Sequence, residues 1–381
     1  MKKVAIIGAG ISGLFIANLF IRNKKYQVKI FERNSLINTK EGYGIQLSVN
    51  SIKLLNKIQF DKLENDEKFN PDKINFYSVK DAAKICDLDI SNFNTENCKY
   101  TTLKRSSLIN FLKKDLEKVI KFDHSISKID QQDQIIKITF KNSEIYECDY
   151  LIISDGVFSK SKNLISKNQI EPQFNNTLAI RGIIPSSSNM ADKKNISLFL
   201  GSNFHYVVYP VSPNGGLNFI AVMKYKLSAD EKKDYSLFNN NNFINKILEK
   251  VPNVKKEFFD NIEDLKIYPV FVSHDFFKVK NNNIHLIGDA FFAFPPSFAQ
   301  GASQSIESAY ELFENLENNT ESNFFKNRVD KTKMVNNRSK LNLFAFHLSN
   351  PLTKFLRNIF LKRLVKNKKF LESYLGKIYR N

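Results

Sequence analysis

Residues 2–34 constrain the fold of this 381-residue chain more than any other stretch. The apolar run "KKVAIIGAG" (2–10) is typical of a buried strand that ends in glycines, and "ISGLFIANLFIRN" (11–23) is typical of an apolar helix. A second strand, "YQVKIFERN" (26–34), follows and ends at Glu32. A strand, a helix and a strand in this order predict a βαβ unit, so we expect an α/β fold.

The turn between the first strand and the helix carries the pattern G-x-G-x-x-G, with Gly8, Gly10 and Gly13. The first glycine allows a tight turn, the second lets the backbone approach a pyrophosphate, and the third lets helix and strand pack closely. The free N–H groups and the dipole at the helix start attract phosphates. Glu32 closes the second strand and can accept hydrogen bonds from a ribose. We therefore predict a dinucleotide site here; the alternative is a glycine-rich turn without a ligand.

The chain contains only one such fingerprint. A protein with separate domains for two dinucleotides would normally show two, so we expect one tightly held dinucleotide and a second that visits transiently.

Beyond residue 34 the pattern alternates between helical and strand-like stretches. Helical spacing occurs at 51–58 and 105–120, and everything after about 300 is mainly helical. Short alternating strands are expected over 122–147, an apolar strand over 148–159 that ends in Asp155-Gly156, several β-rich segments over 176–272, and a buried strand over 282–290. The polar stretch "DYSLFNNNNF" (234–243) is expected to be a loop.

Composition excludes several classes of protein. No apolar run reaches 18 residues, so a membrane-spanning helix is not expected. Three cysteines without a C-x-x-C pair fit a reducing cytoplasm and argue against dithiol chemistry and a zinc site, and we expect no metal. The net charge of +18 invites a nucleic-acid interpretation, but the lysines are spread along the chain and only the C-terminus has a clustered patch, so no nucleic-acid partner is expected.

Four segments in order resemble the class A FAD-dependent aromatic monooxygenases, the family of para-hydroxybenzoate and salicylate hydroxylases. They are "GAGISG" (8–13), "KRSSLINFL" (104–112), "ISDGVFSKSK" (153–162) and "IGDAFFAFPPSFAQGASQSIE" (287–307). The segments "GYGIQLSVNSIKLL" (42–55) and "GSNFHYVVYPV" (201–211) are similar to the salicylate hydroxylase branch rather than to the ubiquinone branch.

This resemblance implies a Rossmann-like FAD-binding domain, an interleaved and mostly β substrate domain, and a C-terminal helical region. The FAD-binding domain is expected in three parts, 1–70, 101–175 and 273–330, and the substrate domain in two, 71–100 and 176–272, followed by C-terminal helices over 331–381.

The resemblance also implies which residues contact FAD: Gly8, Gly10, Ser12, Gly13, Glu32, Arg33, Gly44, Arg105, Asp155, Gly156, Asp289, Pro296, Gly301 and Ala302. Asp289 would hydrogen-bond the ribityl chain, and the Pro-Pro and Gln-Gly segments after it would pass along the flavin ring. A helix that begins near Gly301 would direct its N-terminus at the flavin pyrimidine, where its dipole favours negative charge.

Other interpretations of these residues stay open at this point. Asp289 also fits a turn or an N-cap, and Asp155-Gly156 fits a hairpin turn. Arg105 also fits a solvated helix residue, and Arg33 fits either an adenine contact or a surface position. Two departures from the family pattern stand out: Phe291 and Phe292 follow "GDA", and Lys162 replaces an arginine.

The activity implied is reduction of FAD by NADH or NADPH, capture of O2 as a flavin hydroperoxide, and hydroxylation of a small aromatic, phenolic substrate. Gln46 and Tyr209 occupy family positions that face the substrate or the flavin, and we take them as candidate catalytic residues; the alternative for both is a packing role. Arg181 fits either an acidic substrate or the surface. His205 and His285 are interpreted as structural histidines with satisfied hydrogen bonds.

The C-terminal stretch "NPLTKFLRNIFLKRLVKNKKFLESYL" (350–375) is basic and amphipathic. It predicts either a helix packed on the FAD-binding domain or a helix lying on a membrane surface. The second interpretation would add peripheral membrane association to a cytoplasmic protein and would suit a hydroxylase of ubiquinone biosynthesis. A non-hydroxylating FAD reductase or flavoprotein is a third alternative, although the absence of tryptophan argues against halogenase and prenyl-reductase signatures.

Overall fold

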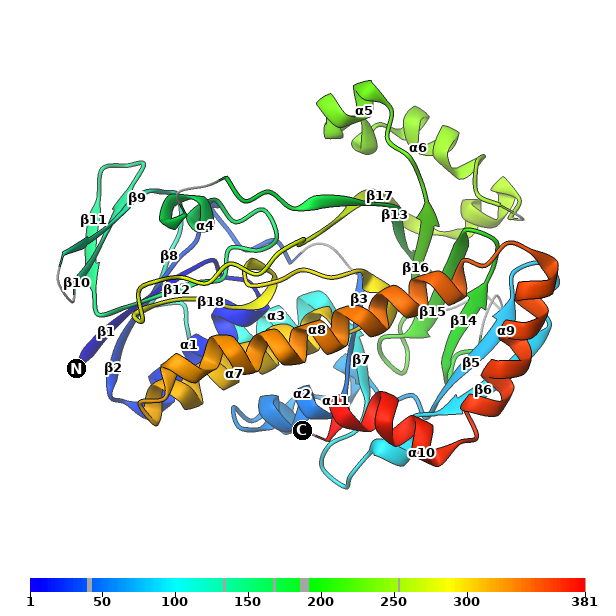
Figure 1. Cartoon of the computed structure of the whole chain (residues 1–381), viewed down its shortest axis with the longest axis horizontal. Coiled ribbons are helices and arrows are strands. Elements are labelled where there is room, and N and C mark those ends of the chain that lie inside the picture. The colour runs from blue at the N-terminus through cyan, green and yellow to red at the C-terminus, as the bar shows by residue number, and fades with distance from the viewer. Residues whose placement is uncertain (40–42, 133–134, 167–168, 186–191, 253, 381) are drawn as a thin grey trace.

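A five-stranded parallel sheet forms the N-terminal half of the molecule (Figure 1). The computed structural model describes residues 1–39, 43–132, 135–166, 169–185, 192–252 and 254–380. The sheet has the strand order β18 (Ile284–Leu286), β12 (Tyr150–Ile153), β1 (Lys2–Ile7), β2 (Tyr26–Phe31) and β8 (Ile120–Lys121). The predicted βαβ unit is confirmed, because β1 pairs in parallel with β2 and α1 (Ile11–Asn23) connects them.

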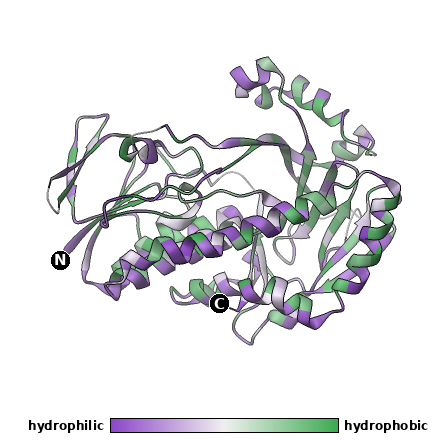
Figure 2. Ribbon diagram, viewed as in Figure 1, coloured by the Kyte–Doolittle hydropathy of each residue, from purple (hydrophilic) through white to green (hydrophobic). Residues whose placement is uncertain are grey.

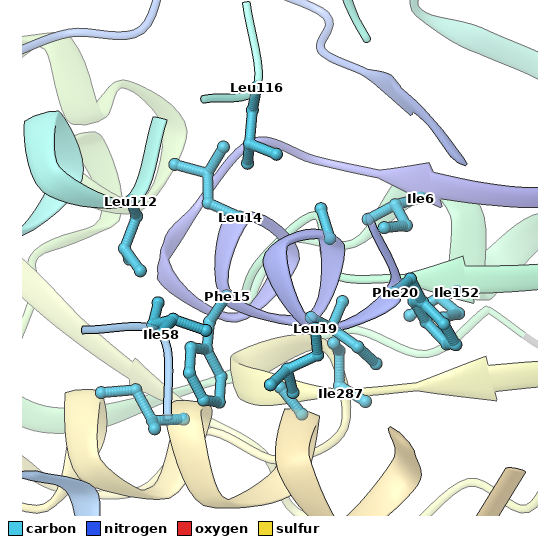
Figure 3. Packing of buried hydrophobic residues seen from close by; sticks show 14 of the residues in the cluster. Ile6, Leu14, Phe15, Leu19, Phe20, Ile58, Leu112, Leu116, Ile152 and Ile287 are labelled. Carbon is cyan, nitrogen blue, oxygen red and sulfur yellow. The ribbon is translucent and has the colours of Figure 1, made fainter. Parts of the chain in front are cut away.

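Both faces of this sheet are covered, which explains why its central strands are apolar at successive positions, over residues 4–7 in β1 and Tyr150–Ile153 in β12. Val4 and Ile6 point toward α1 and α7 (Gly301–Glu317), whereas Ala5 and Ile7 point toward a three-stranded antiparallel sheet. Figure 3 shows the first of these cores around α1. The three-stranded sheet is formed by β9 (Ile126–Gln132), β10 (Ile135–Phe140) and β11 (Ile145–Cys148).

A seven-stranded sheet forms the other half of the molecule. Its order is β17 (Glu263–Val272), β13 (Gln173–Ile184), β16 (Leu217–Lys224), β15 (Phe204–Pro210), β14 (Ile196–Leu200), β5 (Lys73–Ser78) and β6 (Lys84–Asp89). All pairings are antiparallel except that of β14 with β5. One face packs against the 3₁₀ helix Tyr235–Asn239 and α6 (Asn241–Leu248), which follow α5 (Ala229–Lys233), and the other face lines a cavity.

A small sheet connects the two halves. It consists of β3 (Gly44–Leu47), β7 (Thr101–Lys104) and β4 (Lys68–Phe69), and β7 leads directly into α3 (Arg105–Lys113). Between β3 and β7 the chain forms α2 (Val49–Asn56), and after β12 it forms α4 (Lys160–Ile165).

The last eighty residues are helical, as expected. They form α7, α8 (Glu321–Phe346), α9 (Pro351–Leu364), α10 (Lys368–Leu371), a π-helical turn (Glu372–Gly376) and α11 (Lys377–Tyr379). The long helix α8 crosses the molecule and is largely hydrophilic (Figure 2). Within the described part of the chain, no helix is both long enough and apolar enough to span a bilayer.

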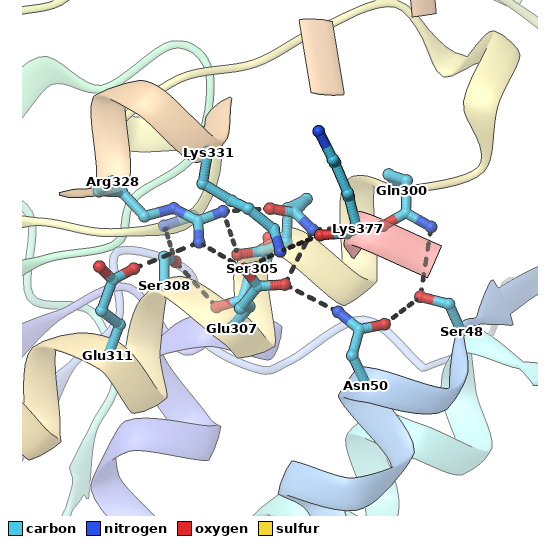
Figure 4. A network of polar contacts seen from close by, with 12 residues as sticks. Ser48, Asn50, Gln300, Ser305, Glu307, Ser308, Glu311, Arg328, Lys331 and Lys377 are labelled. Carbon is cyan, nitrogen blue, oxygen red and sulfur yellow. Dashed lines mark hydrogen bonds and ion pairs between the residues drawn. The ribbon is translucent and has the colours of Figure 1, made fainter. Parts of the chain in front are cut away.

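A polar network fastens α8 to α7 and α2 (Figure 4). Arg328 of α8 is 2% exposed and pairs with Glu307 at 3.3 Å and with Glu311 at 3.5 Å. Glu307 also accepts a hydrogen bond from Asn50 of α2 at 2.7 Å. Loss of either carboxylate would leave the buried charge of Arg328 without full compensation, which is strongly destabilising. This network therefore fixes the relative positions of the three helices.

Four sequence expectations need correction. Residues 234–243 are not a loop: a 3₁₀ helix (Tyr235–Asn239) is followed by α6, which Asn240 caps by accepting from the backbone N–H of Phe243. The helix expected over 105–120 ends at Lys113. The strand expected over 282–290 ends at Leu286 and turns into a 3₁₀ helix at Gly288–Ala290. The C-terminal helix α9 packs beside β6 of the seven-stranded sheet rather than on the parallel sheet.

Candidate functional site

The glycine turn after β1 is shaped by close backbone contacts. Gly8 has φ +99°, and a Cβ placed there would lie 2.7 Å from the carbonyl oxygen of Ser154. A Cβ on Gly13 would lie 2.1 Å from the carbonyl oxygen of Gly8. Only glycine fits at these two positions, because a side chain would push α1 away from β1 and β12.

Gly10 and Gly156 border open space instead. A Cβ on either would meet no atom within 4 Å, and Gly156 has φ +85°. The first turn of α1 begins beside Gly10, and its leading N–H groups lack intrahelical acceptors, as at any helix start. No side chain caps this turn either. Open space in front of a helix N-terminus, bordered by glycines, is a site that a phosphate group can fill.

Two carboxylates flank this turn. Glu32 lies directly after β2; its Oε2 accepts a hydrogen bond from the N–H of Ala9 at 2.9 Å, so it supports the glycine turn from the neighbouring strand. Asp155 follows β12; its Oδ2 accepts from the N–H of Ser161 at 3.2 Å, while its buried Oδ1 has no partner among the described residues. The hairpin alternative for Asp155-Gly156 is wrong, because the chain continues into α4.

Three basic residues predicted near the nucleotide differ in their surroundings. Arg33 is exposed beside Glu32. Arg105 is half-buried at the first position of α3, where its N–H donates to the carbonyl of Tyr43 at 2.8 Å. Lys162, which stands where the family has arginine, is 5% exposed; burial lowers its pKa, and the charge of Asp155 acts in the opposite direction.

The turn that carries Asp289 lies against the glycine turn. Gly288 has φ +59°, and a Cβ there would lie 2.5 Å from the Oγ of Ser12 in the first turn of α1. Asp289 therefore lies next to the predicted phosphate site while its side chain opens onto the cavity. The surrounding protein desolvates this carboxyl group and raises its pKa to about 6. Asp289 is not an N-cap, since it lies inside the 3₁₀ helix Gly288–Ala290, whose N-cap position is Ile287.

The cavity itself has a volume of about 780 Å³ and lies between the seven-stranded sheet, the loop after Asp289 and the C-terminal helices. Seven of the predicted site residues line it: Gly44, Gln46, Tyr209, Asp289, Pro296, Gly301 and Ala302. The helix α7 begins at Gly301, as expected. A Cβ on Gly301 would meet no atom within 4 Å, so the start of this second helix also borders open space.

A small polar group lies on one wall of the cavity. Tyr209 of β15 is 3% exposed, and burial raises its pKa, while hydrogen bonding from Gln46 and Asn218 acts in the opposite direction. Gln46 in turn accepts a hydrogen bond from the hydroxyl of Tyr100 at 2.8 Å, and Asn218 accepts from the N–H of Gly44 at 2.5 Å. Tyr209 thus stays protonated at neutral pH and is held by side chains from two strands, Gln46 of β3 and Asn218 of β16.

Arg181 of β13 also lines the cavity, which excludes the surface alternative. Its guanidinium lies 5.8 Å from the ring centroid of Tyr43, and its charge opposes the rise in the pKa of Tyr209 that burial causes. A cation on this wall can attract an anionic substrate group.

The remaining walls are mostly apolar. The wall formed by the C-terminal helices was not predicted from the sequence. Residues from the end of α8, from α9 and from α10 line the cavity, among them Leu341, Phe344, Leu356 and Phe360. Tyr100 and Asn218 were also missed, because nothing in their local sequence distinguishes them from ordinary strand residues.

The two histidines interpreted as structural are both buried. His205 hydrogen-bonds His347 at the end of α8, with 2.8 Å between Nδ1 and Nε2, and burial lowers the pKa of His347 to about 4. His285 is only partly as expected: burial lowers its pKa to about 4, but its Nε2 has no hydrogen-bond partner in the described part of the chain. Among the described residues no cluster of histidine, cysteine or acidic side chains could hold a metal ion.

Comparisons with known proteins agree with this geometry. The family model described as "FAD binding domain" matches residues 1–322. Salicylate hydroxylase of Pseudomonas putida is 23% identical over 81% of this chain and 75% of its own length, and 6-hydroxynicotinate 3-monooxygenase of Bordetella bronchiseptica is 20% identical over 96% and 98%.

Two solved structures share the fold. The Klebsiella pneumoniae protein HpxO complexed with FAD and uric acid has a TM-score of 0.84 at 13% identity and covers 98% of this chain and 97% of its own. A salicylate hydroxylase substrate complex has a TM-score of 0.77 at 19% identity, covering 100% of this chain and 95% of its own.

Proposed function

The chain belongs to the FAD binding domain family, and on this premise we propose that it is a monooxygenase that uses NADH or NADPH and O2 to hydroxylate a small phenolic ring. The observation that carries the proposal is the position of Asp289, which lines a mostly apolar cavity and follows Gly288, whose turn lies against Ser12 in the first turn of α1. A reaction on an aromatic ring needs such a chamber next to the cofactor.

The residues present fit FAD. The space beside Gly10 and Gly156 and the unpartnered Oδ1 of Asp155 suit the nucleotide end, Glu32 suits a ribose, and Asp289 suits the hydroxyl groups of the ribityl chain. The chemistry supplied by FAD when bound is acceptance of a hydride from the nicotinamide and activation of O2. The N-terminus of α7 lies at the cavity and favours negative charge there.

The polar group on the cavity wall would orient the substrate. The hydroxyl of Tyr209 remains protonated, so it can donate one hydrogen bond and accept one from a phenolic hydroxyl. Gln46 would fix the position of the Tyr209 hydroxyl, and Arg181 can hold a carboxylate or phenolate of the substrate ring. The apolar walls exclude water from the reacting atoms, which protects an activated oxygen from wasteful loss.

The relatives do not favour the two alternatives. Those named above are ring hydroxylases, so a non-hydroxylating flavoprotein and a hydroxylase of ubiquinone biosynthesis have less support.

The test starts with the visible spectrum of the purified protein and the identity of the cofactor released on unfolding. We expect oxidised-flavin bands and FAD. A screen of phenolic acids should then yield compounds that accelerate NADH or NADPH oxidation and acquire one oxygen atom from labelled O2. A colourless protein that cannot be reconstituted with FAD, or substrate-independent oxidation with every ring tested, would overturn the proposal.

A further inference from the structure

The helix α9 is poorly buried for its composition. Of its 14 residues, seven are leucine, isoleucine or phenylalanine, yet the only buried side chain is that of Arg357. Leu352 and Phe355 are 65% and 62% exposed, and neither lines the cavity. An apolar helix that buries an arginine and exposes its phenylalanines lacks a partner for its outer face.

The exposed apolar side chains continue onto the end of α8. Leu341 and Phe344 are 55% and 65% exposed there. We call residues 341–369 the α8–α9 corner; it contains six of the large exposed apolar side chains: Leu341, Phe344, Leu352, Phe355, Leu356 and Phe360. Figure 2 shows hydrophobic and hydrophilic residues interspersed along α9 at the edge of the molecule.

The corner is also strongly basic. From Lys331 to Leu371 the chain contains no aspartate or glutamate and eleven lysines and arginines. The exposed cations at and beyond the end of α9 are Lys362, Arg363, Lys366, Lys368 and Lys369. Exposed leucine and phenylalanine beside lysine and arginine, with no acidic residue, are typical of a helix that lies in the interface of an anionic membrane.

The position of α9 is fixed by Leu361, which packs against the neighbouring core, and by polar contacts of Arg357 and Lys354. Arg357 is 8% exposed, and its guanidinium donates to the carbonyl of Ala345 at 3.3 Å, close to the C-terminus of α8. Lys354 donates to the hydroxyl of Ser202 at 3.3 Å, near β15. These contacts hold the helix on the protein while Leu352 and Phe355 face outward.

A second copy of the chain does not suit this face. In a two-fold symmetric interface the same residues meet each other, and this segment has no carboxylate to pair with its own cations. Two such faces would therefore repel each other, whereas anionic headgroups neutralise them.

We propose that the α8–α9 corner docks the protein on an anionic lipid surface, with Leu352 and Phe355 inserted among the acyl chains and the basic residues at the headgroups. The inference goes beyond the proposed function and concerns where the protein works. Four of the six apolar residues of this corner also line the cavity, so docking places one wall of the cavity at the bilayer; they are Leu341, Phe344, Leu356 and Phe360.

The test is sedimentation of the full-length, FAD-loaded protein with vesicles of phosphatidylglycerol and phosphatidylcholine in equal parts. We expect the protein to pellet with these vesicles at low salt and not with phosphatidylcholine alone. The double variant Leu352→Glu/Phe355→Glu should weaken binding about tenfold or more. Raising the salt concentration should weaken binding of the wild type as well.

A matched control is available on the three-stranded sheet, at the opposite end of the molecule (Figure 1). Ile135 and Ile145 are 49% and 52% exposed, so Ile135→Glu/Ile145→Glu changes two exposed apolar residues and the net charge equally. This control should bind vesicles like the wild type.

A second variant tests the charges alone. Lys362→Gln/Arg363→Gln/Lys366→Gln should reduce binding to the anionic vesicles about tenfold or more. Its matched control is Lys114→Gln/Lys118→Gln/Lys121→Gln, at exposed positions around the end of α3 and on β8, which should change binding much less.

Three outcomes would overturn the proposal. They are absence of binding to anionic vesicles at low salt, equal loss of binding in a corner variant and its control, and a dimer in solution that Leu352→Glu/Phe355→Glu dissociates. Because sedimentation requires no substrate, its result is independent of the hydroxylation assay. A protein that binds vesicles without hydroxylating, or hydroxylates without binding, separates the two proposals.

Discussion

The glycine turn around Gly8 and the cavity around Tyr209 lie in one molecule but differ in what holds their shape. In the turn, backbone atoms touch backbone atoms: carbonyls of Ser154 and Gly8 leave no room for a Cβ on Gly8 or Gly13. In the cavity, side chains from sheet strands and C-terminal helices form the walls. A backbone-built site accepts one residue type at each contact point, whereas a side-chain-built site can be remodelled one wall at a time.

The largest effect is expected from a methyl group placed in the backbone contact. Gly13→Ala should lower the stability of the flavin-free protein by about 3 kcal/mol or more, because the new Cβ overlaps the carbonyl of Gly8. Thermal and denaturant unfolding would measure it. An unchanged unfolding midpoint would show that α1 can move aside and that the turn is not rigid.

A methyl group added at Gly10 should lower the affinity for FAD and leave the stability of the protein nearly unchanged. Gly10→Ala should change stability by less than about 1 kcal/mol, since its Cβ meets no protein atom. FAD affinity should fall about 100-fold, or ~2.7 kcal/mol, because the methyl occupies the space predicted for phosphate. Titration of flavin-free protein with FAD measures this, and equal affinity would place the phosphates elsewhere.

In the cavity, removal of the Tyr209 hydroxyl should affect turnover and leave the stability of the protein and its affinity for FAD unchanged. Tyr209→Phe should reduce the yield of hydroxylated product per NAD(P)H about tenfold, because the substrate loses its hydrogen-bond partner. Tyr206→Phe is the matched control: Tyr206 lies on the same strand but packs against Phe199 and Phe219 on the opposite face of the sheet. If both variants lose activity equally, Tyr209 has only a packing role.

The smallest effect concerns Asp289, where the two regions meet. Its pKa in the folded, flavin-free protein is raised from 3.8 to about 6, so the folded state binds more protons than the unfolded state between these values. Stability is therefore fully present below about pH 4 and partly lost as the pH rises to about 6. Solvent in the cavity screens the carboxylate, so the expected change in Tm is small, about 2 °C or less.

Asp289→Asn should remove this part of the pH dependence. Unfolding scans of flavin-free wild type and variant between pH 4 and 7 make the comparison. Parallel curves would mean that Asp289 does not titrate in this range.

The contrast between the two regions also explains what could be predicted from the sequence. The glycine turn, Glu32 and the helix start at Gly301 are local patterns, in which neighbouring residues specify the backbone. The family resemblance predicted the fold correctly because its motifs are also local patterns, most of them turns at strand ends. The contacts assigned to FAD and the six-part division into domains stay predictions.

The cavity walls could not be predicted, because they depend on tertiary contacts. Nothing in "NPLTKFLRNIFLKRL" indicates that α9 packs beside β6, and its amphipathic pattern fits several partners equally well. Arg181 was ambiguous between surface and interior because its strand neighbours are apolar on both sides. Asn240 offered a helix-cap signal for α6, but the polarity of the surrounding asparagines favoured a loop.

The strand order of the parallel sheet has a consequence for how the chain is made. Its first strand, β1, pairs with β12, and β12 pairs with β18, which lies about 130 residues beyond β12 in the chain. During synthesis the edge of β12 therefore stays unpaired until the ribosome has made most of the polypeptide, and Asp289 and α7 follow β18. The nascent chain must keep an unpaired, apolar strand edge from aggregating during that interval, and it can acquire its nucleotide only near the end of translation.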